Sequence, residues 1–368
     1  MNKRQLKNAE WSILITTILL IVVGLVAQYS ATLSSDLADF KKQIIWLVVS
    51  IPIFLITIII DYRTIAKASI VFYIVCLILL LTVLFTSAVN GARSWFSIGP
   101  ISIQPGEFAK IAVVLLLATT INKINKREHG KINSPLKLIE TIGICLLPVI
   151  LIALQPDYGT AMSYIVSLLF MLFVAGINKK YIFISILLII VLVPVMYFFV
   201  LPEHAKSRID VYLNPYLDPR GAGYNIIQSK IAIGAGGLIG LGWLKGTQTH
   251  LGFLYPKTTD FIFSVIGEEM GFAVTAGIVI VYVILITKAI YIAKTAKDDL
   301  GSYIATGIAG IFLFHMVENI GMTIGLLPIT GVPLPFVSYG GSSLLTNLIL
   351  IALLLNISGR RQKAIFIE

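Results

Sequence analysis

The sequence predicts an all-α polytopic membrane protein, in which residues 1–368 form a single bundle of about ten transmembrane helices. Two observations carry this prediction. Hydrophobic residues make up 57% of the chain and charged residues only 12%, whereas a soluble domain carries about a quarter charged residues. The apolar residues also form long runs, and roughly 20 of them cross a hydrocarbon core about 30 Å thick as a helix. Each run must be helical because lipid offers no partners for backbone polar groups.

Ten apolar runs satisfy this description, and nine or eleven spans are the alternatives. In chain order they cover residues 12–29, 44–60, 68–86, 107–121, 138–154, 158–175, 181–201, 260–290, 303–326 and 342–357. The fourth and fifth runs are short for a span, so their helices are expected to start earlier or to tilt less.

The distribution of Lys and Arg sets the expected orientation. With the N-terminus inside, the short outer loops carry only Lys41, Lys42 and Arg93, and most other cations fall in cytoplasmic segments. The long outer segment 202–259 carries six, but long loops cross the membrane largely regardless of charge. Both termini are therefore expected in the cytoplasm. The net charge of +10 is then a topology signal with affinity for anionic lipid, and nucleic acid is not an expected partner.

Ionisable residues inside spans are costly and are therefore candidates for function. On the predicted topology they gather in the outer halves of the spans, which places the chemistry on the outer face. They are Glu107, Lys110, Asp157, Asp260, Glu268, Glu269, His315 and Glu318, together with the polar Asn319.

Each candidate also has a structural interpretation. Glu107 and Lys110 are three residues apart and can form an ion pair on one helix face instead of holding substrate. Asp157 precedes a long helix and can cap it. Asp260 can also act as a cap, or as a general base whose pKa is raised by apolar surroundings.

Two further groups are interpreted by helical geometry. Only one of Glu268 and Glu269 can share a site with Asp260, because they point to different sides of the helix, and the other is expected to pair with a neighbouring helix. His315, Glu318 and Asn319 form one polar stripe, which favours hydrogen bonds between helices over a metal site.

The outer loops are predicted to be partly ordered. Residues 223–232 have the spacing of an amphipathic helix lying on the outer leaflet. The glycine-rich residues 234–242 indicate either close backbone approach to a ligand or a sharp re-entrant bend. Residues 328–343, with three prolines and three glycines, indicate a structured lid.

Several long motifs, in order, resemble the SEDS family of bacterial shape, elongation, division and sporulation proteins along nearly the whole chain. The motifs are Asn90-Gly91-Ala92-Arg93-Ser94-Trp95, Gln104-Pro105-Gly106-Glu107-Phe108-Ala109-Lys110, Gln155-Pro156-Asp157-Tyr158-Gly159-Thr160-Ala161, Thr259-Asp260-Phe261-Ile262-Phe263, Gly267-Glu268-Glu269-Met270-Gly271 and Pro333-Leu334-Pro335-Phe336-Val337-Ser338-Tyr339-Gly340-Gly341-Ser342. Gly246-Thr247-Gln248 and Asp61-Tyr62-Arg63 are more similar to the RodA branch than to the FtsW branch, and sporulation paralogues share much of this similarity. Gly106 departs from the family motif, in which many relatives have Ser.

The resemblance implies a peptidoglycan glycosyltransferase of cell-wall elongation that polymerises lipid II at the outer face of the bacterial cytoplasmic membrane. It implies that the residue matching Asp260 is essential for polymerisation and that those matching Glu107, Lys110 and Asp157 contribute. It also implies a class B penicillin-binding protein and other membrane proteins of the elongation complex as partners.

The chemistry needs a base near the attacking sugar hydroxyl and positive charge near the leaving pyrophosphate. We expect Asp260 to be the base and Lys110, with Arg208, Lys230 or a bound Mg²⁺ or Mn²⁺, to hold the pyrophosphate. Glu107 or Asp260 would hold that ion, and no organic cofactor is expected. Further candidates for substrate binding are Gln228, Thr259, Glu268 and Ser338.

Two other classes of function stay open from the sequence. A lipid II flippase would need a polar path through the whole membrane, whereas the inner halves of the predicted spans are apolar. A non-catalytic scaffold for a penicillin-binding protein would need only a docking surface, for which the small residues of the eighth and ninth spans are candidates.

Overall fold

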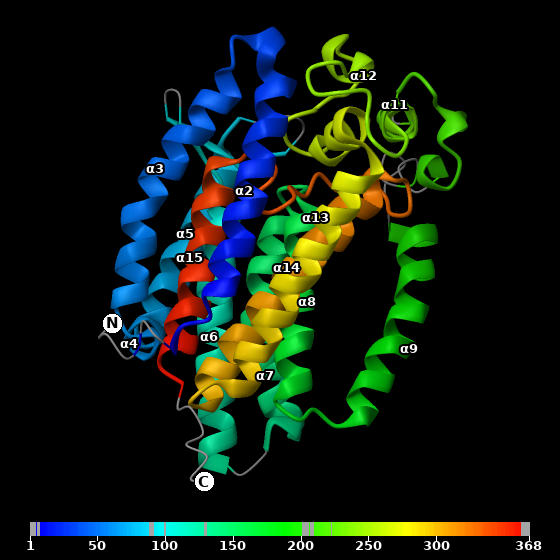
Figure 1. Cartoon of the computed structure of the whole chain (residues 1–368). Coiled ribbons are helices and arrows are strands. Elements are labelled where there is room, and N and C mark those ends of the chain that lie inside the picture. Colours follow the sequence, from blue (N-terminus) through cyan, green and yellow to red (C-terminus); the bar gives the residue numbers. More distant parts are fainter. Residues whose placement is uncertain are drawn as a thin grey trace.

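The computed structural model describes residues 5, 8–87, 92–98, 101–128, 131–200, 206, 210–221 and 223–361. Within this part of the chain, ten helices coincide with the ten predicted spans and form an all-α bundle (Figure 1). They are α2 (Trp11–Thr32), α3 (Ala38–Ile59), α5 (Ser69–Thr82), α6 (Pro105–Glu128), α7 (Pro135–Ala153), α8 (Tyr158–Val174), α9 (Lys179–Val195), α13 (Ile262–Thr295), α14 (Asp299–Thr323) and α15 (Gly341–Gly359).

Length and composition mark six of the described helices as able to cross a membrane, namely α2, α3, α7, α13, α14 and α15. The stretch Ser69–Phe85 and α8 are shorter apolar helices. The fourth predicted span is longer than its apolar run, because α6 continues through Lys123 and Lys126 to Glu128. Charged residues at the end of a span extend the helix without lengthening its apolar run. Hydropathy therefore underestimates the length of the helix.

The bundle has an inside and an outside. Helix α15 lies at its centre, with 89% of its apolar window buried, while only 22% of the α3 window is buried. Large apolar side chains such as Ile45, Val48 and Ile59 of α3 are exposed, as expected of a surface that faces lipid. Figure 1 shows α9 standing apart from the other helices.

One end of the bundle is closed by polar contacts between the start of α2 and the end of α15. The backbone amide of Glu10 donates to Ser358 Oγ, at 3.1 Å. The Glu10 carboxylate pairs with Lys288 of α13 and with Arg361, each at 3.1 Å. The first and last spans therefore begin and end on the same side, as an even number of spans requires.

At the opposite end, short elements cover the bundle. They are α11 (Tyr224–Gly236), α12 (Thr247–His250), the 3-10 turn Pro215–Leu217 and a hairpin of β1 (Phe96–Ile98) and β2 (Ile101–Ile103). No strand was predicted from the sequence. The hairpin alternates apolar residues with Ser97 and Ser102 over only three residues a strand, which is too short a pattern to stand out among long apolar runs.

The amphipathic helix predicted over residues 223–232 is present as α11. Helix α11 packs against α13 and α14. Its Ser229 Oγ lies 2.6 Å from Ser264 Oγ and donates to the carbonyl oxygen of Thr323 at 2.6 Å. The buried side of α11, which carries Ile226, Ser229 and Ala232, therefore meets protein.

The glycine-rich residues 234–242 do allow close backbone approach, but the neighbour in this structure is a helix and not a ligand. A Cβ atom at Gly236 would lie 1.8 Å from the carbonyl oxygen of Gly267, and one at Gly240 would lie 2.2 Å from that of Glu269. Helix α13 is interrupted opposite this loop at Gly271, which has a φ of 76°. The backbone amides of Leu241 and Gly242 donate to the carbonyls of Glu268 and Glu269 at the interruption, at 2.9 and 3.0 Å.

Candidate active site

A cavity of about 850 Å³ opens at the covered end of the bundle, opposite Glu10 and Arg361. It lies between the ends of α2, α3, α8 and α15 on that side, the β1–β2 hairpin, Gln104 just before α6, α11 and two irregular segments. Its polar lining includes Asp39, Lys42, Ser94, Ser97, Ser102, Gln104, Asp157, Thr160, Asn225, Tyr255, Lys257, Thr258, Thr259, Asp260, Thr330, Tyr339 and Ser343.

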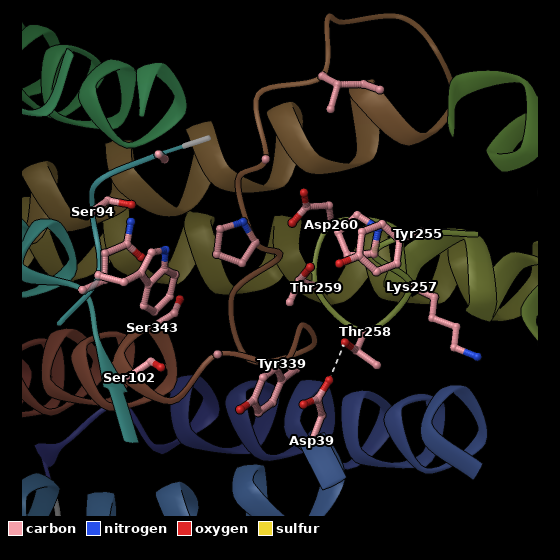
Figure 2. Close-up of a pocket in the computed structure, with 18 of the residues that line it drawn as sticks. Asp39, Ser94, Ser102, Tyr255, Lys257, Thr258, Thr259, Asp260, Tyr339 and Ser343 are labelled. Atoms are coloured by element: carbon pink, nitrogen blue, oxygen red, sulfur yellow. Dashed lines mark hydrogen bonds between the residues drawn. The ribbon is translucent and has the colours of Figure 1, made fainter. Parts of the chain in front are cut away.

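Asp260 lines this cavity and does not cap a helix. Helix α13 begins at Ile262, its N-cap position is Phe261, and no side chain caps it. The Asp260 carboxylate is half-buried, next to Thr259 in Figure 2. Burial, with a smaller contribution from the negative charge of Asp157, raises the pKa of Asp260 to about 6. Near neutral pH such a carboxylate is deprotonated and is basic enough to accept a proton from a hydroxyl in the transition state.

The backbone around Asp260 is held by three hydrogen bonds from other segments. Ser338 Oγ donates to the carbonyl oxygen of Thr259 at 2.6 Å, and the amide of Tyr339 donates to that of Thr258 at 2.8 Å. Asn319 Nδ2 of α14 donates to the carbonyl oxygen of Asp260 at 3.0 Å. Ser338 is buried, and its hydroxyl is already hydrogen-bonded to the backbone of Leu334 and Thr259. It does not line the cavity, although it is one of the predicted substrate-binding residues.

Asp157 is both a cap and a cavity residue, so its two interpretations hold together. Its Oδ1 accepts from the amide of Thr160 in the first turn of α8, at 3.2 Å. Its Oδ2 accepts from Gln104 Nε2, at 2.7 Å, and both side chains line the cavity. The cavity wall therefore carries a second carboxylate besides Asp260. Burial raises the pKa of this carboxylate as well.

Glu107 and Lys110 form the predicted ion pair, at 2.7 Å, but outside the cavity lining. Lys110 is 0% and Glu107 1% exposed. Glu107 also accepts from Thr346 of α15 at 3.0 Å, and Lys110 Nζ lies 3.5 Å from His315 Nε2 of α14. The pair therefore ties α6 to α15 and α14. Neither side chain lines the cavity, so in this structure Lys110 is not placed to contact a substrate there.

Glu268, expected to share the site with Asp260, instead caps α12. Its carboxylate accepts from the amides of Gln248 and Thr249 at 2.7 and 3.0 Å, and from Thr249 Oγ1 at 2.7 Å. Glu269 pairs with a neighbouring helix as expected, because it accepts from Ser30 of α2 at 2.6 Å. Neither glutamate lines the cavity.

The polar stripe of α14 makes the expected hydrogen bonds to other segments. His315 Nδ1 lies 3.1 Å from the carbonyl oxygen of Pro333, and Thr330 donates to Glu318 at 2.8 Å. Asn319 donates to the carbonyl oxygen of Val332 at 2.8 Å. These bonds anchor the predicted lid, in which Val332 and Leu334 are buried, so the lid is a fixed wall of the cavity.

The comparisons with known proteins agree with this geometry. The family model described as "Cell cycle protein" (FtsW, RodA, SpoVE) matches residues 10–363. The chain belongs to the FtsW/RodA/SpoVE family. The chain is 38% identical to "Peptidoglycan glycosyltransferase MrdB" of Escherichia coli K12 over 335 residues, which cover 89% of each chain. It is 33% identical to "Peptidoglycan glycosyltransferase RodA" of Treponema pallidum, covering 98% of this chain and 100% of the relative, and 35% identical to "Stage V sporulation protein E" of Bacillus subtilis, covering 94% and 96%.

Solved structures of the family share the fold. One, described as "Structural coordination of polymerization and crosslinking by a peptidoglycan synthase complex", has a TM-score of 0.83 at 27% identity and covers 95% of this chain and 97% of that chain. RodA of Thermus thermophilus has a TM-score of 0.72 at 25% identity, covering 96% and 98%. The all-α membrane bundle is thus the fold of this family.

The remaining predicted site residues of this family member lie in different places. Thr259 lines the cavity. Gln228 and Lys230 are on α11, but the cavity is lined by Asn225 and Ile226 of that helix, and Lys230 is exposed. Arg208 lies outside the described residues.

Three charged cavity residues were not predicted. Asp39 and Lys42 come from the first turns of α3, and Lys257 comes from the segment before Asp260. Thr258 Oγ1 donates to Asp39 at 2.9 Å (Figure 2), which fixes the segment to α3. Lys42 did leave a signal in the sequence, because it is one of the few cations in the short outer loops.

The described residues contain no group of three or more His, Cys, Asp or Glu side chains placed to hold a metal ion. Glu107, one of the two expected ion ligands, does not fit, because its carboxylate is buried against Lys110 and Thr346. Asp260 fits better, since Mg²⁺ commonly uses one or two carboxylates together with substrate phosphates and water, and Asp157 faces the same cavity.

Proposed function

We propose that this chain is a peptidoglycan glycosyltransferase that polymerises lipid II at the outer face of the bacterial cytoplasmic membrane during cell-wall elongation. The observation that carries the proposal is Asp260, a half-buried carboxylate with a pKa near 6 in a polar cavity at one end of a membrane bundle. Relatives named for this activity, alignable along 89% or more of the chain, support the same conclusion.

The reaction joins two lipid-linked sugars. A hydroxyl oxygen of the acceptor sugar attacks the anomeric carbon of the donor, and the bond from that carbon to the pyrophosphate oxygen breaks with inversion. Asp260 accepts the proton of the attacking hydroxyl, and undecaprenyl pyrophosphate leaves with the bonding electrons. Because pyrophosphate is a good leaving group, a single carboxylate acting as base is sufficient, and no acid need protonate the leaving group.

The leaving pyrophosphate needs positive charge that can reach the cavity. Lys42 and Lys257 line it, whereas Lys110 and Lys230 do not. Lys257 Nζ donates to the carbonyl of Thr249 at 2.9 Å, and burial lowers the pKa of Lys257. Because Lys42 and Lys257 are the lysines in the described cavity lining, we assign the contact with pyrophosphate to them, and Lys257 would have to exchange its bond to Thr249 for one to the pyrophosphate. A Mg²⁺ or Mn²⁺ ion held by Asp260 and Asp157 would supply further positive charge at the same place.

Glu107 and Lys110 act on the site indirectly in this proposal. Their buried ion pair fixes the start of α6 against α15 and α14. Gln104, three residues before Glu107, holds Asp157 from the same segment. The pair is therefore a positioning element, and its loss would displace the cavity wall.

The protein's expected partner is a class B penicillin-binding protein, which would crosslink the new strands. One structural relative is described as part of a peptidoglycan synthase complex, which supports an assembly of this kind.

The proposal is tested by incubating the purified chain in detergent with lipid II, alone and with a class B penicillin-binding protein, and separating the products by length. We expect glycan strands. A detergent micelle has no two leaflets between which lipid II could be moved, so a flippase would form no glycan strands in this assay. A non-catalytic scaffold alone would form none either. Absence of strands under both conditions would contradict the proposal.

A further inference from the structure

A second cavity lies at the end of the bundle opposite the proposed active site. It has a volume of about 340 Å³ and is lined by Arg63, Ala66, Lys67, Thr119, Asn122, Lys126, Asp298 and Leu300. Arg63 and Lys67 are four residues apart on α4 (Tyr62–Lys67), so they share one face. Thr119, Asn122 and Lys126 share a face of α6. The described lining holds three cations and one carboxylate.

The one carboxylate is already occupied. Asp298 Oδ2 accepts from Nε and Nη2 of Arg63, each at 2.8 Å, and Oδ1 accepts from Tyr62 Oη and the amide of Gly301, each at 2.9 Å. Four donors fill the acceptor sites of a carboxylate. Asp298 thus holds Arg63 in place at the cavity and leaves the lysine ammonium groups uncompensated.

Within the described part of the chain, neither Lys67 nor Lys126 has a hydrogen-bond or ion-pair partner. Two such cations with an oriented guanidinium are suited to a phosphate group. Asn122 Oδ1 is buried without a partner on the same wall. A buried acceptor such as Asn122 Oδ1 is costly to leave without a hydrogen-bond donor. A phosphate diester alone has no hydrogen to donate, whereas a lipid headgroup with a free hydroxyl has one.

Apolar surface continues from the cavity along the next helix. Ile70, Val71 and Ile74 follow Lys67 on α5 and are 56%, 63% and 51% exposed. A ligand with its phosphate at Lys67 could therefore lay acyl chains on α5. The positive-inside distribution places this end in the cytoplasmic leaflet, where basic pockets between spans bind anionic headgroups.

We propose that this cavity binds the headgroup of an anionic glycerophospholipid that carries a free hydroxyl, such as phosphatidylglycerol. Lys67, Lys126 and Arg63 contact the phosphate, and Asn122 accepts a hydrogen bond from the headgroup hydroxyl. The site is independent of the proposed transferase chemistry, because none of its lining residues lines the active-site cavity.

Native mass spectrometry of the full chain in detergent, titrated with phosphatidylglycerol, tests the proposal. Each lysine near a membrane surface contributes about 1 kcal/mol, or roughly fivefold in affinity. Lys67→Gln/Lys126→Gln is therefore expected to weaken the first bound lipid roughly 30-fold. The control pair Lys123→Gln/Lys179→Gln removes two exposed cations outside the cavity and should leave that affinity unchanged. Equal loss in both pairs would contradict the proposal.

Two further arms identify the ligand. Asn122→Leu should weaken phosphatidylglycerol more than phosphatidylmethanol, a phosphate diester without a headgroup hydroxyl, and equal weakening would overturn the role of Asn122. Glycerol phosphate in water should compete poorly with the lipid. Competition at the same concentration would show a site for a free phosphate ester and would overturn the assignment to lipid. Lys67→Arg/Lys126→Arg should retain binding, because it keeps both charges.

Discussion

Asp260 and Asp157 reach the same cavity by different means. Asp157 accepts hydrogen bonds from the first turn of α8 and from Gln104, one at each carboxylate oxygen. The backbone carbonyls of Thr258, Thr259 and Asp260 accept hydrogen bonds from Tyr339, Ser338 and Asn319, and the Asp260 carboxylate lines the cavity. Two carboxylates with different surroundings can take different roles. Burial raises the pKa of both carboxylates. We assign the base to Asp260 because its carboxylate, unlike that of Asp157, caps no helix.

The raised pKa of Asp260 predicts a pH dependence. A general base acts when deprotonated, so kcat/KM should fall about tenfold per pH unit below a pKa near 6 and level off above it. Initial rates of lipid II polymerisation between pH 5 and 8 measure this profile. A rate independent of pH across that range would argue against Asp260 as the base.

The assignment of Lys42 to the pyrophosphate is tested against its neighbour. Lys42 lines the cavity and Lys41 does not. Lys42→Gln removes a charge that stabilises the leaving group, and we expect a loss of about 10- to 100-fold in kcat/KM. Lys41→Gln should stay near wild type. Polymerisation kinetics with lipid II compare the two variants, and equal effects would show that only general surface charge is involved.

At the scale of elements, the buried Glu107–Lys110 pair is a structural tie between α6, α14 and α15. Removing one member leaves the other as an uncompensated buried charge, which costs about 3–5 kcal/mol. Glu107→Gln should therefore lower the midpoint of thermal unfolding in detergent far more than the double change Glu107→Gln/Lys110→Met.

The same variants separate a positioning role from direct contact. If the pair only positions the cavity wall, the double variant should recover activity along with stability. A double variant as stable as wild type but without polymerase activity would show that Lys110 contacts the substrate.

The interruption of α13 is the second feature at this scale. Gly271 has a φ of 76°, and a Cβ there would lie 2.3 Å from the backbone nitrogen of Gly240. Gly271→Ala should destabilise the protein by more than the roughly 1 kcal/mol of an unfavourable φ alone. Gly277 lies in the same helix, and a Cβ atom added there would meet nothing within 4 Å. Gly277→Ala should therefore be neutral or slightly stabilising, and equal melting points for the two variants would contradict the packing described.

At the scale of the whole molecule, the bundle sorts its ionisable groups by end. The active-site cavity lies at the end covered by α11 and α12, and the basic cavity of Arg63, Lys67 and Lys126 lies at the other. The predicted orientation requires the end covered by α11 and α12 to face the outside of the cell. Lys245→Cys in the covering loop should then react with a membrane-impermeant maleimide in intact cells. Lys297→Cys should react only after permeabilisation, and the opposite pattern would invert the topology. The native Cys76 and Cys145 are buried.

The fold was predictable because lipid solvation leaves helices as the natural solution for long apolar runs, so α2 and α15 are visible in the sequence. The ion pair of Glu107 and Lys110 was predictable for a similar reason, since both residues lie on one helix face. The position of that pair away from the cavity was not predictable, because hydropathy gives no information on which side of a helix meets a cavity. Glu268 was misplaced because its partner, the start of α12, lies in a loop whose path local sequence does not determine. Lys42 and Lys257 join the site through tertiary contacts, such as those of Thr258 with Asp39 and of Gln43 with Gly340, which local sequence does not reveal.

The most direct test of Asp260 as the base is the polymerisation rate of Asp260→Asn with purified lipid II, at pH 7.5 in detergent. The control is Asp36→Asn, which changes an exposed aspartate outside the cavity that has a φ of 50°, a conformation that Asn tolerates. We expect Asp260→Asn to lose at least about 100-fold in rate, the low end of the contribution of a general base. It should keep the wild-type melting point, and Asp36→Asn should polymerise normally. Glycan strands formed by Asp260→Asn at the wild-type rate would contradict the assignment.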